Sequence, residues 1–204
     1  ALADWERAVE YLHRAVEADP RFANAWALLS RTLTAEALWG KVPYHHLLAE
    51  EARLAAKQAL KLNNALPHPH LAFAELLWFI DFDVRGAGAQ IQQALELGTN
   101  SPEALEWAAL MPTYRGQFDK ALVLAQKSVA IDPVNPEAYD NLTLIYYFAG
   151  RYAEAMATTR KTLDLFPEAR DLYDLRMAYV LLAKGDPAAA ITQIEGDKEL
   201  RETC

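Results

Sequence analysis

The chain has 204 residues and a formal net charge of −8, so it repels phosphate backbones, and nucleic-acid binding is not expected. Hydrophobic residues make up 52% of it, which excludes disorder, and the single cysteine, Cys204, cannot form an internal disulfide. No stretch approaches the roughly 18 apolar residues of a membrane span and no signal peptide opens the chain, so we expect a cytoplasmic protein, with a periplasmic one left open.

Composition and periodicity predict an all-helical chain. Alanine and leucine dominate, and the residues between them are strong helix formers that lose little side-chain freedom in a helix. The first predicted helix covers residues 3–18 and reads as the second helix of a pair whose first helix is missing. From residue 23 onward we expect pairs, the last of which fades after Ile194 into a polar stretch. Both ends read as cut, so the chain is expected to be part of a longer protein.

The strongest signal is an internal repeat. Residues 102–133 can be laid over residues 136–167, a shift of 34 positions. Within one unit, a helix over 136–149 should end at Gly150, where glycine suits a left-handed residue, and a second helix should cover 152–165. The residues that coincide at this shift include Pro102 and Pro136, Gly116 and Gly150, Phe118 and Tyr152, Ala121 and Ala155, and Pro133 and Pro167.

This pattern resembles the tetratricopeptide repeat (TPR), which places an aromatic residue, Leu, Gly and Tyr on a first helix and Ala, a large apolar residue and Pro on a second. The resemblance covers nearly the whole chain. It implies an all-α fold, a right-handed superhelical solenoid of antiparallel helix pairs, that serves to bind a protein. The residues that stand in those places in one unit are Tyr139, Leu142, Thr143, Tyr146, Ala155 and Pro167.

The predicted array is a single domain over residues 1–204 with two irregular segments. About ten extra residues fall near 34–46, and a turn of Asp81, Phe82 and Asp83 is expected to cap a helix with an acidic residue. Together these segments resemble a bacterial subgroup in which the array follows an adenylate cyclase or winged-helix domain, which implies a signalling parent protein. The predicted units are 1–22 (a half unit), 23–66, 67–101, 102–135, 136–169 and 170–204 (partial).

A binding groove is expected on the first helices of the pairs, since these line the concave face of TPR arrays. Residues three, four and seven apart share one side of a helix, and here they are acidic at one end and apolar at the other. Such a groove suits a protein or peptide that carries Lys or Arg beside large apolar anchors. The candidate groove residues are His68, Leu71, Glu75, Trp78, Phe79, Glu103, Glu106, Leu110, Tyr114, Glu137, Asp140, Leu144, Tyr147 and Phe148.

Less specific interpretations stay open beside this one. The aromatic residues can be packing and the acids a solvated face, or the array can serve self-association. A small-molecule pocket at the insertion is a weaker alternative. Self-association is inferred from Leu172, Leu175, Tyr179 and Leu182, and the pocket from Trp39, Tyr44, His45 and His46.

No chemistry is expected of the chain. Adjacent histidines on a helix point about 100° apart, so His45 and His46 cannot serve one metal from one helix, and a metal site needs three or four convergent ligands. His68 and His70 flank a proline with no cysteine nearby. No glycine-rich phosphate loop or nucleophile elbow is found. We therefore predict no enzyme activity, no metal and no cofactor.

Overall fold

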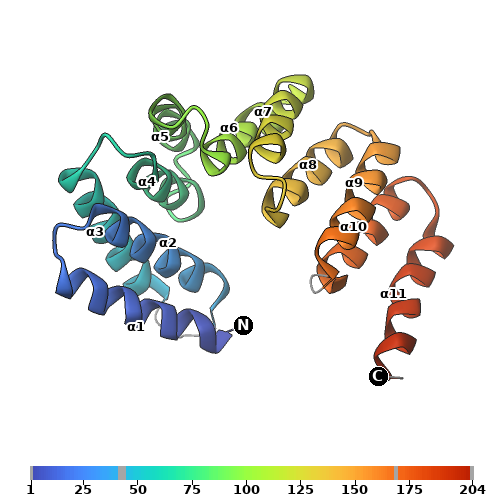
Figure 1. Cartoon of the computed structure of the whole chain (residues 1–204), viewed down its shortest axis with the longest axis horizontal. Coiled ribbons are helices and arrows are strands. Elements are labelled where there is room, and N and C mark those ends of the chain that lie inside the picture. Colours follow the sequence, from blue (N-terminus) through green and yellow to red (C-terminus); the bar gives the residue numbers. More distant parts are fainter. Residues whose placement is uncertain (1, 41–44, 168–169, 203–204) are drawn as a thin grey trace. The chain divides into compact units, whose positions relative to one another are not determined.

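The computed structural model describes residues 2–40, 45–167 and 170–202, and it describes side chains for 5–40, 45–167, 170 and 173–195. The described part of the chain consists of eleven α-helices without a strand, and successive helices run antiparallel (Figure 1). The predicted all-α class of paired helices is confirmed. The helices are α1 Leu2–Ala18, α2 Ala23–Trp39, α3 His45–Leu62, α4 Pro67–Phe79, α5 Val84–Leu97, α6 Pro102–Tyr114, α7 Phe118–Ile131, α8 Pro136–Phe148, α9 Tyr152–Leu165, α10 Arg170–Ala183 and α11 Pro187–Glu202.

The chain divides into two compact units, Ala1–Trp107 and Ala108–Cys204, which are described separately. In the first unit the core lies between α2, α3 and α4 and includes Leu29, Leu33 and Leu76. In the second unit a core cluster joins residues of α6, α7, α8, α9 and α10. Alanines are fully buried in both units, and their small side chains let paired helices approach closely. The buried members of the cluster in the second unit are Ala109, Ala121, Leu122, Ala125, Leu142, Ile145, Tyr146, Ala155 and Val180.

Among the turns within helix pairs that the structure describes in full, those before α7, α9 and α11 share one conformation and the turn before α5 differs in its residue type. Gly116, Gly150 and Gly185 each lie two residues before the second helix of a pair and have φ values of +68°, +71° and +87°. Glycine adopts this left-handed conformation without a steric penalty, which confirms the predicted role of Gly150. In the turn between α4 and α5 the same place is taken by Phe82, with φ of +54°.

The two irregular segments have simple structural descriptions. Much of the predicted insertion lengthens helices, because α2 has 17 residues and α3 has 18, whereas α8 and α9 have 13 and 14. Pro43 and Tyr44 of the insertion lie outside the described residues. The acidic cap is confirmed, since Asp83 precedes α5 and its side chain accepts a hydrogen bond from the Gly86 N–H.

The predicted fading of the last unit after Ile194 is wrong. Helix α11 continues to Glu202, through Gly196. The residues that follow this glycine are mostly strong helix formers, and a single glycine inside a helix costs only about 1 kcal/mol. The polar stretch is therefore the last part of a helix.

Candidate functional site

In the first unit, two predicted groove residues bind an arginine that sequence reasoning missed, and a third lies beside one of them. The guanidinium of Arg31 on α2 donates from Nε to Oε2 of Glu75 on α4 at 2.8 Å, and from Nη1 to Glu103 on α6. His68 Nε2 lies 3.6 Å from the other carboxylate oxygen of Glu103. This cluster borders a cavity of about 350 Å³ that Asn24, Ala27 and Leu28 of α2 also line. The carboxylates that were predicted to face a basic partner thus already hold an internal cation.

The other predicted residues of this unit divide between core and surface. Leu71 is fully buried in a core cluster with Ala94 and Ala104, so its side chain is not exposed on a groove surface. Glu75 and Glu106 are also buried, whereas His68 is exposed. Trp78 and Phe79 are partly buried. Phe79 packs between two tryptophans, with ring centroids 6.0 Å from Trp39 and 6.3 Å from Trp107, and Trp39 in turn lies 6.3 Å from Trp5.

In the second unit, an ion pair links the first helices of two successive pairs. Asp140 on α8 accepts hydrogen bonds from Nε and Nη2 of Arg176 on α10 at 2.8 and 3.0 Å, a bidentate arrangement that fixes the guanidinium. The hydrogen bond from Arg176 to Asp140 raises the pKa of the arginine above its usual value. Beside the pair, Tyr173 donates to the Pro136 carbonyl at 2.9 Å, and burial, followed by the Asp140 charge, raises its pKa to about 12.

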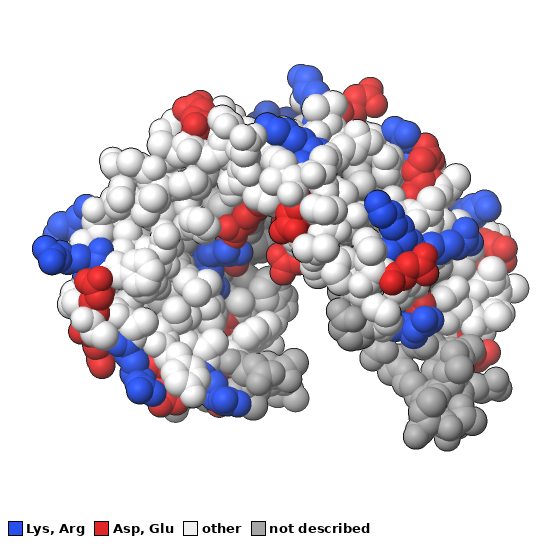
Figure 2. Space-filling model, viewed as in Figure 1, with Lys and Arg blue, Asp and Glu red and all other residues white. Residues whose placement is uncertain are grey.

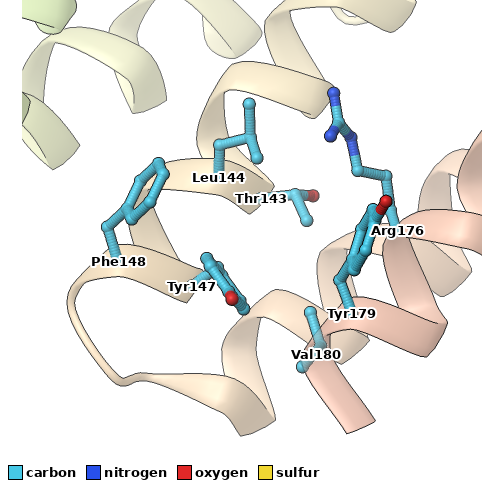
Figure 3. Close-up of a pocket in the computed structure, with 7 residues that line it drawn as sticks. All are labelled: Thr143, Leu144, Tyr147, Phe148, Arg176, Tyr179 and Val180. Carbon is cyan, nitrogen blue, oxygen red and sulfur yellow. The ribbon is translucent and has the colours of Figure 1, made fainter. Parts of the chain in front are cut away.

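Next to this ion pair lies an apolar pocket between α8 and α10, with a volume of about 260 Å³. Tyr147 and Tyr179 face each other across it from the two helices, and Phe148 stands at its outer end (Figure 3). Leu144, Tyr147 and Phe148 were predicted groove residues, and the structure brings them together here. We call this site the α8–α10 pocket; it is lined by Thr143, Leu144, Tyr147, Phe148, Arg176, Tyr179 and Val180.

The pocket combines apolar walls with a few polar atoms. Arg176 uses two of its five N–H donors on Asp140, so the remaining donors can serve an occupant. The hydroxyl of Thr143 is buried and has no hydrogen-bond partner in the structure. An aromatic cavity with few directional polar groups is suited to an apolar side chain whose neighbouring backbone or carboxylate accepts hydrogen bonds.

Two further predicted residues lie near the end of α6. Tyr114 is exposed and lines a cavity of about 230 Å³ with Thr113, Phe118 and Phe148, so Phe148 borders two cavities. Leu110, one turn earlier, is partly buried. Glu137, one turn before Asp140 on α8, is exposed.

The predicted groove is therefore less negatively charged than the number of its acidic residues suggests. Arg176 neutralises Asp140, and Arg31, which is shared by Glu75 and Glu103, offsets one of their two negative charges. On the face shown in Figure 2, charges of both signs are interspersed on each unit and wide uncharged areas separate them. Among the residues that the structure describes, no continuous acidic stripe is visible on this face.

His70 and His45 have structural partners. His70 is held between the Gln90 side chain at 2.7 Å and the Asn64 carbonyl at 2.9 Å, and His45 lies 2.7 Å from the Ala37 carbonyl. Among the described residues no group of three or more metal-ligating side chains comes together. No helix in the described ranges has the length and apolar character to cross a bilayer.

Both missed arginines carried a signal in the sequence. Arg31 and Glu75 are 44 positions apart, which is also the offset between the predicted starts of their units, residues 23 and 67. Residues at equivalent positions of neighbouring first helices lie side by side in a stacked array. Opposite charges at equivalent or near-equivalent positions, such as Asp140 and Arg176, could therefore have been paired before the structure was known.

No protein-family model matches the sequence, and no curated protein matches it. Several solved structures are similar to the chain. A thermophilic TPR protein from Thermus thermophilus is 20% identical with a TM-score of 0.73, and the match covers 89% of this chain and 93% of that chain. PilW, described as a widely conserved type IV pilus biogenesis factor, is 20% identical with a TM-score of 0.69, covering 94% of this chain and 83% of its own.

A third similar structure is YrrB, described as a TPR protein with an unusual peptide-binding site. It is 15% identical with a TM-score of 0.55, and the match covers 92% of this chain and 90% of that chain. At these identities the likeness concerns the fold alone. The helix pairs of this chain have the fold of tetratricopeptide-repeat proteins.

Proposed function

We propose that the chain is a protein-binding scaffold that holds a segment of a partner in the α8–α10 pocket. The observation that carries the proposal is the pocket itself, where aromatic side chains of two stacked first helices leave an apolar cavity open to solvent. Buried aromatic and arginine anchors dominate the binding energy of protein interfaces, and the pocket offers both residue types. Peptide binding by YrrB, a protein of the same fold, is consistent with this use.

The proposed partner is defined by an apolar anchor. The preference for Lys and Arg, predicted from Glu137 and Asp140, loses much of its basis because Asp140 is occupied by Arg176. A large apolar side chain would fill the cavity, and acceptor atoms beside it would meet the free N–H groups of Arg176. The proposal includes a regulatory role in a bacterial signalling protein, which rests on the sequence resemblance of the two irregular segments.

A peptide selection tests the proposal. Peptides selected from a random displayed library against the purified chain should bind Tyr179→Ala about 30-fold more weakly, the loss expected of an interface anchor. Tyr11→Ala is the matched control, since both tyrosines are about half exposed, at 48% and 56%, and Tyr11 lies on α1 in the other unit. Equal binding to both variants, or selection of no peptide, would refute the assignment of the pocket.

A further inference from the structure

The turn between α4 and α5 contains a phenylalanine, Phe82, in a backbone conformation that favours glycine. The turns before α7, α9 and α11 have glycine with positive φ at the equivalent position, and an added Cβ at those glycines would meet no atom within 4 Å. Phe82 adopts the same left-handed conformation, at +54°, and is the one residue other than glycine that does so in the described ranges. A residue with a Cβ is strained there by about 1 to 2 kcal/mol. Strained residues of this kind are found at functional sites.

The strained turn also presents its aromatic ring to solvent. Phe82 is 80% exposed, more than any other large hydrophobic residue that the structure describes. The turn around it is braced on both sides. Asp81 pairs with Arg53 of α3, the Asp83 N–H donates to the Leu77 carbonyl at 2.8 Å, and the Asp83 side chain caps α5. The ring therefore projects from a rigid base and adds almost nothing to the core of its own unit.

We propose that Phe82 of one copy enters the α8–α10 pocket of a second copy. This proposal rests on the proposed function, because it names the occupant of the same pocket. A phenyl ring would contact the apolar side chains of Leu144 and Val180 and the aromatic rings of Tyr147, Phe148 and Tyr179, all of which line the pocket.

Charge supports a second copy as the occupant. The ring is followed by the carboxylate of Asp83, which caps α5 and is in no ion pair with a described residue, whereas Asp81 on its other side is paired with Arg53. The pocket has the guanidinium of Arg176 at its rim. Two N–H donors of Arg176 bind Asp140, and the remaining donors can bond the Asp83 carboxylate as Phe82 enters. The Asp83 carboxylate also disfavours the exposed Glu137 as a neighbour, so the turn should approach from the Arg176 side.

The geometry of such a contact has a consequence for assembly. The projecting residue and the pocket are different surfaces of the chain, so the contact is heterologous. A dimer then retains one free Phe82 and one free pocket, and assembly continues beyond the dimer unless a ring closes.

Sedimentation velocity over a wide concentration series tests the proposal. The wild-type chain should form oligomers in a concentration-dependent manner and in the presence of reductant, which excludes cross-linking through Cys204. Phe82→Ala and Tyr179→Ala should each weaken association about 30-fold. Phe22→Ala, which removes another exposed phenylalanine (51%) of the same unit, should leave association unchanged.

A mixture of the two weakened variants gives the sharpest readout. Phe82→Ala keeps its pocket and Tyr179→Ala keeps its projecting ring, so the mixture should form a 1:1 dimer and nothing larger. A wild-type chain that stays monomeric, a Phe82→Ala variant that assembles normally, or a mixture that stays monomeric would overturn the proposal. A monomeric wild-type chain whose selected peptides still depend on Tyr179 would refute self-association alone and leave the proposed function standing.

Discussion

Replacing Phe82 by alanine and by glycine tests the backbone strain of the α4–α5 turn. Both substitutions remove the ring, so any effect of self-association is the same for the two variants. Neither substitution removes much buried apolar surface. The Phe82 side chain is 80% exposed in the folded chain, and it is about equally exposed in the unfolded chain, because realistic unfolded chains are about 10 to 40% less exposed than an extended reference. The two variants then differ in the left-handed backbone alone, which alanine strains and glycine does not.

The expected difference follows from two opposing terms. Relief of the left-handed strain stabilises the glycine variant by about 1 to 2 kcal/mol, and the larger entropy of unfolded glycine offsets about 0.5 to 1 kcal/mol of this. Phe82→Gly should therefore be more stable than Phe82→Ala by about 0.5 to 1 kcal/mol. With a urea m-value of about 2 kcal/mol/M, the unfolding midpoint should rise by roughly 0.25 to 0.5 M.

The reverse substitution provides the control for this reasoning. Gly150→Ala places a Cβ in open space at φ of +71°, so it should destabilise the second unit by about the same amount for the same reason. Circular dichroism during urea unfolding measures all three variants. If Phe82→Ala is as stable as Phe82→Gly while Gly150→Ala is destabilised, the turn at Phe82 is not strained and the functional argument built on it fails.

Three further predictions concern charge and pH. Asp140→Ala removes the carboxylate that holds Arg176 and should lower the free energy of unfolding by about 1 to 2 kcal/mol. In urea unfolding, the Asp140→Ala/Arg176→Ala double variant should lose less stability than the sum of the losses of the two single variants. Because the pKa of Tyr173 is raised to about 12, unfolded tyrosine ionises first, and stability should fall as the pH rises from 10 towards 12; Tyr173→Phe should show a smaller fall in unfolding midpoints over that range, and an equal fall would contradict the assignment. Burial, and secondarily two neighbouring carboxylates, raises the pKa of Glu36, so its ionisation opposes folding above pH 4.5. Glu36→Gln should unfold at a higher urea concentration than the wild type at neutral pH and show no such gain below pH 4.5, and a gain of equal size at both would argue against the shift.

The sequence by itself determined the features that depend on neighbours along the chain. Helix formers at helical spacing, proline in the first turn of α8, and the cap at Asp83 are decided within a few residues, so the helices and most of their ends could be predicted. Because the local pattern repeats after 34 positions, the sequence also predicted that the helices are arranged in pairs.

The candidate site depended on contacts between helices. Leu71 and Leu144 were both predicted as groove residues. Leu71 lies in the core and Leu144 lines a pocket, because the packing around their two helices differs. The repeat places Asp140 and Arg176 at near-equivalent positions, but their bidentate hydrogen bonds depend on the distance between α8 and α10, which no pattern within one helix specifies. Phe82 likewise read as part of a capped turn, and only the folded backbone gave it a positive φ and an exposed ring. Local propensity thus determined where helices form, whereas their stacking decided which side chains are buried, paired or left open to a partner.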